Sequence, residues 1–275
     1  MVIDGKQIAQ KVLSQLKKEI EDKKLKLQMA AVLACPEGVE GLALKKFVEL
    51  KEKAAEKIGI NFKIFQFDKN ISQPVMIHHN TKLSEEFDGV LVELPLPPHL
   101  NQQEILNAIP VEKDVDVLST KAQELFYTNR SLIMPPSAEA LGLLFENMNL
   151  NPEGKTVALF GYGLLIGKPI AHWLEQKGAR ISVIRSKTEN PSEISRKADI
   201  IISGVGKPGL INGDMVKDGV VAIDFGYGKD VNGRMRGDID FDSVVAKASL
   251  ITPVPGGMGP ILIAAVLKNL ILLNS

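Results

Sequence analysis

The amino-terminal part of the chain alternates between two patterns of apolar residues. From Gly5 to Lys23 they recur every four positions, which predicts an amphipathic helix with a charged outer face. Gln28–Cys35 is almost wholly apolar and predicts a buried strand, followed by a helical stretch from about Glu40 to Lys57. Asn61–Phe67 alternates as a strand, and after a weak helix Asp88–Val92 gives a third one. Strands that alternate with helices imply a parallel sheet.

A second series of the same kind begins at Thr156. The run Thr156–Phe160 predicts a buried strand, and a helix is expected through Trp173 to Lys177. Further apolar runs predict strands at Gly178–Ile184, Ala198–Ile202 and Val220–Asp224. This succession is typical of a nucleotide-binding α/β unit.

The length of 275 residues is comfortable for two domains. Between the two series, Met134–Ser137 opens a helix for which Ser137 is a candidate N-cap. We therefore predict a two-domain α/β fold with mainly parallel sheets. The predicted ranges are 1–118, completed by a carboxy-terminal helix at 258–275, and 119–257.

Composition narrows the choice of partner and compartment. The 33 basic residues balance 33 acidic ones, so no global field attracts nucleic acid or an anionic membrane, and neither is expected as a partner. Cys35 is the only cysteine, which fits a reducing compartment. The start does not read as a signal peptide and the closing apolar run is too short to span a bilayer, so we expect a cytoplasmic protein. No histidine spacing suggests a metal site.

Two loops combine stiffness with bare backbone. Thr252–Pro260 alternates prolines, which fix φ, with glycines, which permit positive φ, and this favours a wall that presses main chain against a flat ligand. The alternative is a tight connection into a helix with Pro260 in its first turn. Glu93–His99 contains three prolines and leaves the third strand at the carboxyl end of the sheet, where open α/β sheets bind ligands.

A glycine-rich segment, Gly161–Pro169, stands between strand and helix in the second series. Gly161, Gly163 and Gly167 would let a pyrophosphate approach backbone N–H groups at the positive end of the helix dipole. The spacing is one residue longer than the dinucleotide fingerprint, and the alternative is a glycine turn that serves packing only.

The end of the next strand favours NADP over NAD. An acid at this place usually binds the ribose and repels a 2′-phosphate, but here Arg185, Ser186 and Lys187 offer cations and a hydroxyl. The alternative is a solvated basic loop. Gly206 and Pro208, after the third strand of the series, fit a wall for the nicotinamide ring or merely a turn.

Taken together, these segments resemble the methylenetetrahydrofolate dehydrogenase/methenyltetrahydrofolate cyclohydrolase family over essentially the whole chain. The similar segments follow the order of the family's motifs. They are Val2–Lys6, Val92–Pro97, Lys113–Asp116, Val205–Pro208 and Thr252–Pro260.

The resemblance implies two reactions in one cleft between two domains. Hydride passes from the one-carbon bridge of 5,10-methylenetetrahydrofolate to a nicotinamide, and the methenyl cation is then hydrolysed to 10-formyltetrahydrofolate. The first domain would bind the folate and carry the catalysis. The second would be a Rossmann-type domain that binds NADP, with NAD less favoured, and the family also implies a homodimer.

The resemblance assigns the acid–base chemistry to Lys51, with Phe47 where the family has Tyr and Glu93 where it has Gln. A spacing of four places Phe47 and Lys51 on one helical face. The alternative for Lys51 is an ordinary exposed helix lysine. Other lysines on this stretch are Lys45, Lys46, Lys53 and Lys57.

Glu93 puts the hydrolytic step in doubt. A carboxylate favours the charged lysine, whereas a base must lose its proton near neutral pH. Hydride transfer needs mainly orientation of two ring systems, so it should tolerate the change better. In a second interpretation Glu93 takes a proton from water while Lys51 stays protonated and orients the substrate.

The resemblance also supplies the folate contacts. Asp116 would accept two parallel N–H bonds from the amino-pyrimidine edge of the pterin, although such an acid could also serve a turn or a helix cap. The other expected contacts are Leu94, Pro95, Pro255, Gly256 and Gly257. Departures from the family pattern are Leu44 for Ser, Val117-Leu118 for Gly-Phe, Tyr162 for Arg, Gly163 for Ser, Arg185 for His and Leu262 for Thr.

Two rival functions follow from these departures. One is a dehydrogenase without cyclohydrolase activity, motivated by Leu44, Phe47 and Glu93. The other is a catalytically silent sensor that binds folate or nucleotide and turns over neither. Assays of the two separate steps distinguish them.

Overall fold

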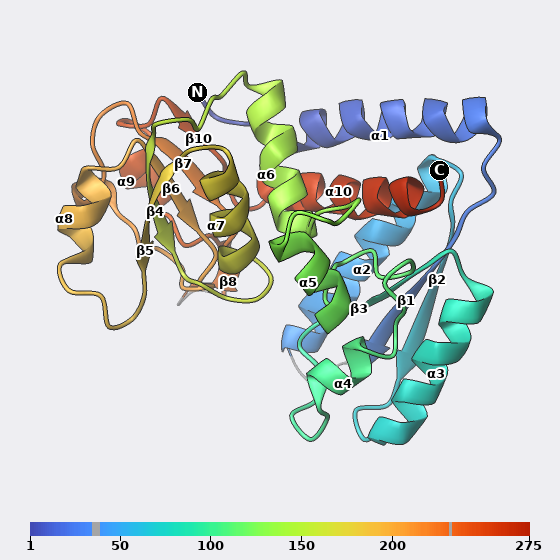
Figure 1. The fold of residues 1–275 in the computed structure, drawn as a ribbon. Coiled ribbons are helices and arrows are strands. Elements are labelled where there is room, and N and C mark those ends of the chain that lie inside the picture. Colours follow the sequence, from blue (N-terminus) through green and yellow to red (C-terminus); the bar gives the residue numbers. More distant parts are fainter. Residues whose placement is uncertain (35–38, 231–232) are drawn as a thin grey trace. The chain divides into compact units, whose positions relative to one another are not determined.

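The computed structural model describes residues 1–34, 39–230 and 233–275 (Figure 1). The chain forms two compact units. We call residues 11–136 and 263–275 the three-stranded unit, and residues 1–10 and 137–262 the five-stranded unit. These units are defined by contacts and not by function, so the functional division after residues 118 and 257 stays a prediction. Cys35, predicted as the end of a strand, lies outside the described residues.

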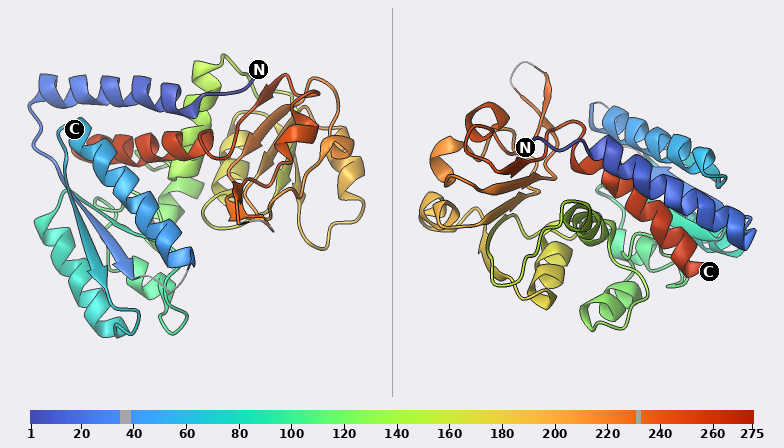
Figure 2. Two further views of the ribbon diagram at one scale, coloured as in Figure 1. Left: turned by 180° about the vertical axis from the view of Figure 1, so that it is seen from behind. Right: turned by 90° about the horizontal axis from the view of Figure 1, so that it is seen from above.

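The three-stranded unit is built on a parallel sheet of order β2-β1-β3. Because β1 leads through α2 to β2 and β2 returns through α3 to β3, right-handed crossovers place α2 and α3 on opposite faces of the sheet (Figures 1 and 2). The elements are β1 Gln28–Ala34, α2 Val39–Lys57, β2 Asn61–Phe67, α3 Gln73–Glu86, β3 Gly89–Val92, α4 Gln102–Leu106 and α5 Thr120–Tyr127.

Two long helices contribute apolar residues to the cores. In α1, Gly5–Lys23, the predicted stripe of Ile8, Val12, Leu16 and Ile20 is buried, which confirms the amphipathic helix. The other, α10 at Met258–Leu273, is apolar nearly all round and its residues are mostly buried, as expected for a helix inside a core.

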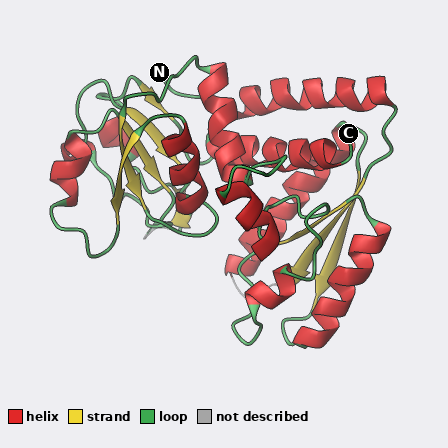
Figure 3. Ribbon diagram, in the orientation of Figure 1, coloured by secondary structure: helices red, strands yellow, loops and turns green. Residues whose placement is uncertain are grey.

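The five-stranded unit has a parallel sheet of order β10-β7-β6-β4-β5. After β4 the chain moves outward to β5 and then returns past β4 to β6, so the order reverses between β4 and β6. Such a switch point is where open α/β sheets bind ligands, beyond the carboxyl ends of the strands. Its elements are α6 Pro136–Asn147, β4 Thr156–Phe160, α7 Gly167–Gln176, β5 Arg180–Ile184, α8 Pro191–Arg196, β6 Ile200–Ser203, the 3-10 helix η1 Gly213–Met215, β7 Val221–Asp224, β8 Gly228–Lys229, β9 Met235–Arg236, α9 Phe241–Val244 and β10 Leu250–Ile251 (Figure 3).

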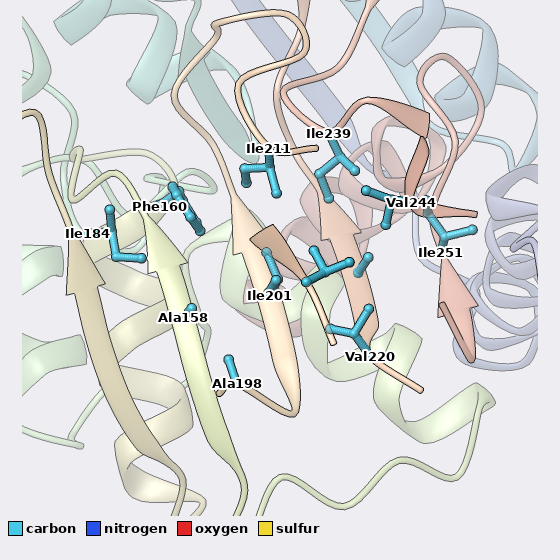
Figure 4. Packing of buried hydrophobic residues seen from close by; sticks show 12 residues of the cluster. Ala158, Phe160, Ile184, Ala198, Ile201, Ile211, Val220, Ile239, Val244 and Ile251 are labelled. Carbon is cyan, nitrogen blue, oxygen red and sulfur yellow. The ribbon is translucent and has the colours of Figure 1, made fainter. Parts of the chain in front are cut away.

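One face of this sheet carries a continuous apolar cluster (Figure 4). Ala158 of β4 and Ile201 of β6 are fully buried in it, together with Val244 from the short helix α9. The cluster packs the sheet against the segments that follow its carboxyl ends, which also supply Ile211 and Ile239. These loops are therefore fixed to the sheet by apolar contacts.

The structure confirms the two-domain α/β fold with mainly parallel sheets, and it corrects one local prediction. Ser137 is not an N-cap, because α6 already begins at Pro136. Its hydroxyl instead donates a hydrogen bond of 2.6 Å to the carbonyl oxygen of Leu165, in the glycine-rich segment. The sequence interpretation also missed the antiparallel pair β8–β9 and the two-residue strand β10.

Candidate functional site

A buried ion pair joins α2 to the end of β3. Nζ of Lys51 lies 2.6 Å from Oε1 of Glu93, and each residue is only 5% exposed. Glu93 follows β3 directly, and its backbone N–H donates to the carbonyl oxygen of Val32 in the neighbouring strand β1. By contrast, the other four lysines considered for α2, namely Lys45, Lys46, Lys53 and Lys57, are exposed. Lys51 is therefore not an ordinary surface lysine.

Phe47 lies one turn before Lys51 on the same face of α2, as its spacing predicted. The Nζ atom of Lys51 stands 4.9 Å from the centre of the Phe47 ring, within the range of a cation–π contact. The ring face attracts the ammonium but cannot accept or donate a proton. Phe47 therefore packs against the ammonium group of Lys51, on which Glu93 also forms its ion pair, and adds no acid–base group.

Asp116 stands on a loop that a second carboxylate holds together. Asp114 is buried and accepts hydrogen bonds from the backbone N–H groups of Leu118, at 3.0 Å, and Ser119, at 2.7 Å. Between them Val117 has a φ of 57°, in the left-handed region that a β-branched residue rarely adopts. The hydrogen bonds to Asp114 therefore hold the loop in a shape that the backbone of Val117 would not adopt by itself.

The amide of Asn269 fixes this loop from α10. Its Nδ2 donates to the carbonyl oxygens of Val115, at 2.9 Å, and Met134, at 2.7 Å. Asn269 is fully buried, and 154 residues separate it from Val115. Asn269 and Asp114 thus hold the residues on both sides of Asp116.

Asp116 belongs to the charged cluster around Lys51. Burial raises the pKa of Asp116 to about 7, the nearby ammonium of Lys51 lowers it, and the charges of Glu93 and Asp114 raise it. The carboxyl group accepts no hydrogen bond from the described part of the chain, while the residue keeps part of its surface exposed. It is thus held next to the ion pair with its oxygen atoms available to a ligand.

The proline run lies directly beyond Glu93. Leu94 is half-buried, Pro95 is exposed, and the peptide bond between them is cis. Leu96 and Pro97 are buried and anchor the run. Of the predicted folate contacts, Leu94, Pro95 and Asp116 therefore belong to the three-stranded unit together with the ion pair.

In the five-stranded unit, the glycine-rich segment follows β4 at the switch point of the sheet. Gly161 has a φ of 89°, which only glycine adopts without strain. A Cβ atom on Gly167, the first residue of α7, would collide with the carbonyl oxygen of Gly161, so the helix start packs against the turn. Gly163 faces open space. Gly163 is exposed, so the backbone of the turn before α7 is open to a ligand, whereas Gly167 at the helix start is buried.

Tyr162 and Arg185 lie together beside this turn. The guanidinium carbon of Arg185 is 4.6 Å from the centre of the Tyr162 ring, and Tyr162 is 38% exposed. The backbone N–H of Arg185 donates to Thr188 Oγ1 at 2.8 Å, which shapes the turn after β5. Ser186 and Lys187 are exposed on that turn. Two cations thus stand at the end of β5, as expected for a 2′-phosphate site.

The loop Gly204–Pro208 follows β6, the neighbour of β4. Gly204 packs against Ile166, and Val205 packs against Gly161, so this loop is in contact with the glycine-rich segment. Gly206 is exposed, with a φ of 75°, and Pro208 is half-buried. The predicted cofactor residues on these two loops therefore lie side by side.

The segment Thr252–Pro260 is fixed to the start of the chain. The N–H of Gly5 donates to the carbonyl oxygen of Gly256, and the N–H of Gly257 donates to that of Pro253. Pro255 is exposed, Gly256 is half-buried and Gly257 is buried. All three belong to the five-stranded unit, whereas Lys51, Glu93 and Asp116 belong to the other. The segment leads into α10, whose first turn contains Pro260, as the alternative interpretation of this segment expected, and its role as a wall of a ligand site stays a prediction.

The part of the chain that the structure describes contains neither a group of potential metal ligands nor a helix that could span a membrane. Within it, no three His, Cys, Asp or Glu side chains are grouped so that they could hold an ion. Its helices are also too short or too polar to cross a bilayer.

Both halves of the chain match models of one protein family. The catalytic-domain model of tetrahydrofolate dehydrogenase/cyclohydrolase matches residues 3–116, and the NAD(P)-binding-domain model of the same family matches residues 135–275. The chain belongs to the tetrahydrofolate dehydrogenase/cyclohydrolase family. The family resemblance and the two-domain fold inferred from the sequence are thereby confirmed.

Similar members of the family span the full chain. The bifunctional protein FolD of Mycoplasmopsis synoviae is 38% identical over 276 residues, covering 98% of both chains. The solved FolD methylenetetrahydrofolate dehydrogenase/cyclohydrolase of Campylobacter jejuni is 32% identical, with a TM-score of 0.91 and coverage of 98% of this chain and 97% of that one. The enzyme from Trypanosoma brucei, solved with NADP cofactor and inhibitor, is 31% identical, with a TM-score of 0.92 and coverage of 99% and 96%.

Sequence reasoning missed the residues that hold the loops of this family member in place. Asp114 stands in the segment Lys113–Asp116 but was given no role of its own, and Asn269 was not among the predicted site residues. A polar residue inside an apolar helix is a usable signal, because a buried amide needs partners. Asp238, which bonds to the loop after β6, gave no local signal at all.

Proposed function

We propose that the protein oxidises 5,10-methylenetetrahydrofolate to 5,10-methenyltetrahydrofolate with NADP and hydrolyses the product to 10-formyltetrahydrofolate. The observation that carries this proposal is the buried Lys51–Glu93 pair beside Asp116, in a chain that both domain models of the family match. A buried charged cluster with a free carboxylate is costly to maintain, and such clusters concentrate at functional sites.

The five-stranded unit offers a set of groups that fits NADP. The turn before α7, with its exposed glycine Gly163, suits the pyrophosphate, and a side chain at Gly167 could not be placed there. Arg185, with Lys187 beside it, suits the 2′-phosphate, because a guanidinium binds phosphate through two parallel hydrogen bonds. The loop with Gly206 and Pro208 would line the nicotinamide. When bound, NADP supplies the acceptor of the hydride.

In the first step the residues of this chain mainly orient the folate. Asp116 would accept N–H bonds from the pterin edge, and Leu94 and Pro95 would line its ring. No proton has to be removed when the hydride leaves, so the charged state of Lys51 does not oppose this step. Good orientation by itself supplies a large part of the catalysis of such a transfer.

For the second step we propose that Glu93 acts on water while Lys51 stays protonated. Water adds to the cationic methenyl carbon, and Glu93 takes one of its protons. Lys51 donates a hydrogen bond to the oxygen that was added. The added hydroxyl group then loses its remaining proton as the bond from this carbon to N5 breaks and N5 takes up a proton, which leaves the formyl group on N10. The 2.6 Å pair supports this assignment, because it places a carboxylate acceptor and an ammonium donor side by side.

The decisive experiment assays the two steps separately on the purified protein. NADPH formation from methylenetetrahydrofolate reports the first step, and loss of the methenyl absorbance reports the second, each with NADP and with NAD. Activity in both steps with a preference for NADP is expected. Undiminished hydride transfer without hydrolysis would favour a monofunctional dehydrogenase, which Phe47 and Glu93 also suggest. Binding of both ligands without turnover would favour a silent sensor.

We also propose that the protein works in the cytoplasm as a homodimer. The dimer rests on the family resemblance, whereas the cytoplasmic location rests on the sequence features given above, among them the lone Cys35, which fits a reducing compartment. Light scattering of the eluted protein should give twice the mass of one chain, and a monomer mass would contradict the dimer. Cell fractionation tests the location.

A further inference from the structure

A fully buried carboxylate binds the loop that follows β6. Oδ2 of Asp238 accepts hydrogen bonds from Ser203 Oγ at 2.7 Å and from the N–H of Val205 at 2.6 Å. Oδ1 accepts one from the N–H of Lys207 at 2.6 Å. Asp238 is 0% exposed, and 31 to 35 residues separate it from these partners. Two alternate N–H groups of the loop are thereby fixed by one side chain.

A second buried carboxylate fixes Asp238 itself. Asp224, the last residue of β7 and the register partner of Ser203, accepts hydrogen bonds from the N–H groups of Asp238, at 3.2 Å, and Ile239, at 2.8 Å. A Cβ atom on Gly226 would collide with the Asp238 carboxylate, and one on Gly237 would collide with that of Asp224. The chain thus leaves room for two carboxylates at the carboxyl end of β6 and β7.

A simple need for stability does not explain this arrangement. Two buried acids close together raise each other's energy, and burial together with the charge of Asp238 raises the pKa of Asp224 to about 7. Neutral hydrogen-bond acceptors could hold a loop of five residues without burying two carboxylates. Asp224 and Asp238 instead fix one backbone conformation of the loop Gly204–Pro208. This loop lies at the switch point of the sheet and contacts the glycine-rich segment.

We propose that Asp238 is a positioning residue for hydride transfer, which sets the shape of the loop Gly204–Pro208 against the nicotinamide half of NADP. The proposal rests on the proposed function. Asp238 does not touch the cofactor in this role but acts through the N–H groups of Val205 and Lys207. Asp224 supports it by holding the backbone of Asp238.

The test variant is Asp238→Asn, which keeps the shape but replaces one acceptor oxygen by an N–H₂ group. At least one of the three donors then faces another donor. An unpaired buried donor of this kind lowers the population of the loop conformation by roughly tenfold to a hundredfold. We expect the KM for NADP to rise and the rate of hydride transfer to fall by a combined factor of this order.

Two readouts separate positioning from general damage. Hydrolysis of methenyltetrahydrofolate needs no nicotinamide, so its rate should be unchanged in Asp238→Asn. Adenosine 2′,5′-bisphosphate carries the 2′-phosphate but lacks the nicotinamide half, so its dissociation constant should also be unchanged. Ser203→Ala removes one bond to the same carboxylate but neither loop bond, and should shift hydride transfer only a few-fold, in the same direction.

Asp199→Asn is the matched control. The carboxylate of Asp199 also accepts three hydrogen bonds, from the N–H and hydroxyl of Thr156 and from Nζ of Lys217, but at the amino end of the same sheet. This variant should lose stability without a change in any kinetic constant for NADP. The melting temperature and the NADP kinetics of both variants are measured, so that an effect of lower stability on the kinetics can be told apart from an effect of the loop.

Three outcomes would overturn the proposal. Unchanged NADP kinetics in Asp238→Asn would show that the loop does not depend on the carboxylate. An equal loss of hydride transfer, hydrolysis and bisphosphate binding would show a structural role only. If Asp238→Asn does not fold, unchanged NADP kinetics in Ser203→Ala decides against it. Failure of the proposed function is recognised separately, because the unaltered protein would then form no NADPH.

Discussion

Replacement of Lys51 by Met tests whether the buried ion pair serves catalysis or the fold. At 2.6 Å and an effective dielectric constant of about 20, the attraction between Lys51 and Glu93 is about 6 kcal/mol. The desolvation of two ions costs several kcal/mol each, so the pair as a whole is close to neutral for stability. Lys51→Met leaves the carboxylate of Glu93 buried and unpaired, and this should cost about 3–5 kcal/mol.

The neighbourhood of the pair predicts an asymmetry between its two halves. Without Lys51, Glu93 faces the like charges of Asp116 and Asp114, which act in the same cluster. Without Glu93, Lys51 still has Asp116 as a counter-charge. Glu93→Met should therefore destabilise the protein less than Lys51→Met, and the double variant, which buries no unpaired charge, should recover most of the stability.

Stability and activity should respond differently in the two single variants and the double variant. Denaturant unfolding measures the free energy of unfolding, and methenyl absorbance measures hydrolysis. Lys51→Met and the double variant should both have lost hydrolysis, although only the first is strongly destabilised, and the affinity for NADP should be nearly unchanged in both. Hydrolysis at the normal rate in either variant would refute the role of Lys51. Additive stability losses in the double variant would refute the buried coupling, and an equal loss of NADP affinity would show that the lysine is misassigned.

Three further predictions concern the other contacts. Arg185→Ala should weaken NADP about tenfold to a hundredfold and NAD much less, because it removes a charged partner of the 2′-phosphate, and equal effects on both would contradict the cofactor assignment. Since the pKa of Asp116 is raised to about 7 and only its carboxylate accepts the pterin N–H groups, the folate KM should rise about tenfold per pH unit as the pH falls below 7. Asp116→Asn should abolish this dependence, and a KM profile like that of the unaltered protein would count against it. Phe47→Tyr restores a hydroxyl beside Lys51, and faster hydrolysis with unchanged hydride transfer is expected; no gain would mean that the hydroxyl is not the missing group.

The apolar pattern was sufficient to predict the main elements of both sheets. Helix α1 and strands β2 and β4 have the predicted bounds, because their apolar spacing and the flanking turn residues mark both ends. The hairpin β8–β9 and strand β10 have two residues in each strand, too few for a period to be recognised. Ser137 carried a local capping signal, but its hydroxyl found a partner 28 residues away.

Some features of the candidate site could likewise be predicted from the sequence, and others could not. The sequence by itself determined that a proline run follows β3, that glycines follow β4, and that Arg185 follows β5, since these features depend on neighbours in the chain. Only the tertiary structure decided that Lys51, among several lysines of one helix, meets Glu93 42 residues later, and that Asp238 binds the loop after β6. The physical reason is that periodicity reports which face of an element is buried, whereas the partner of a buried charge depends on which strands are adjacent in the folded sheet.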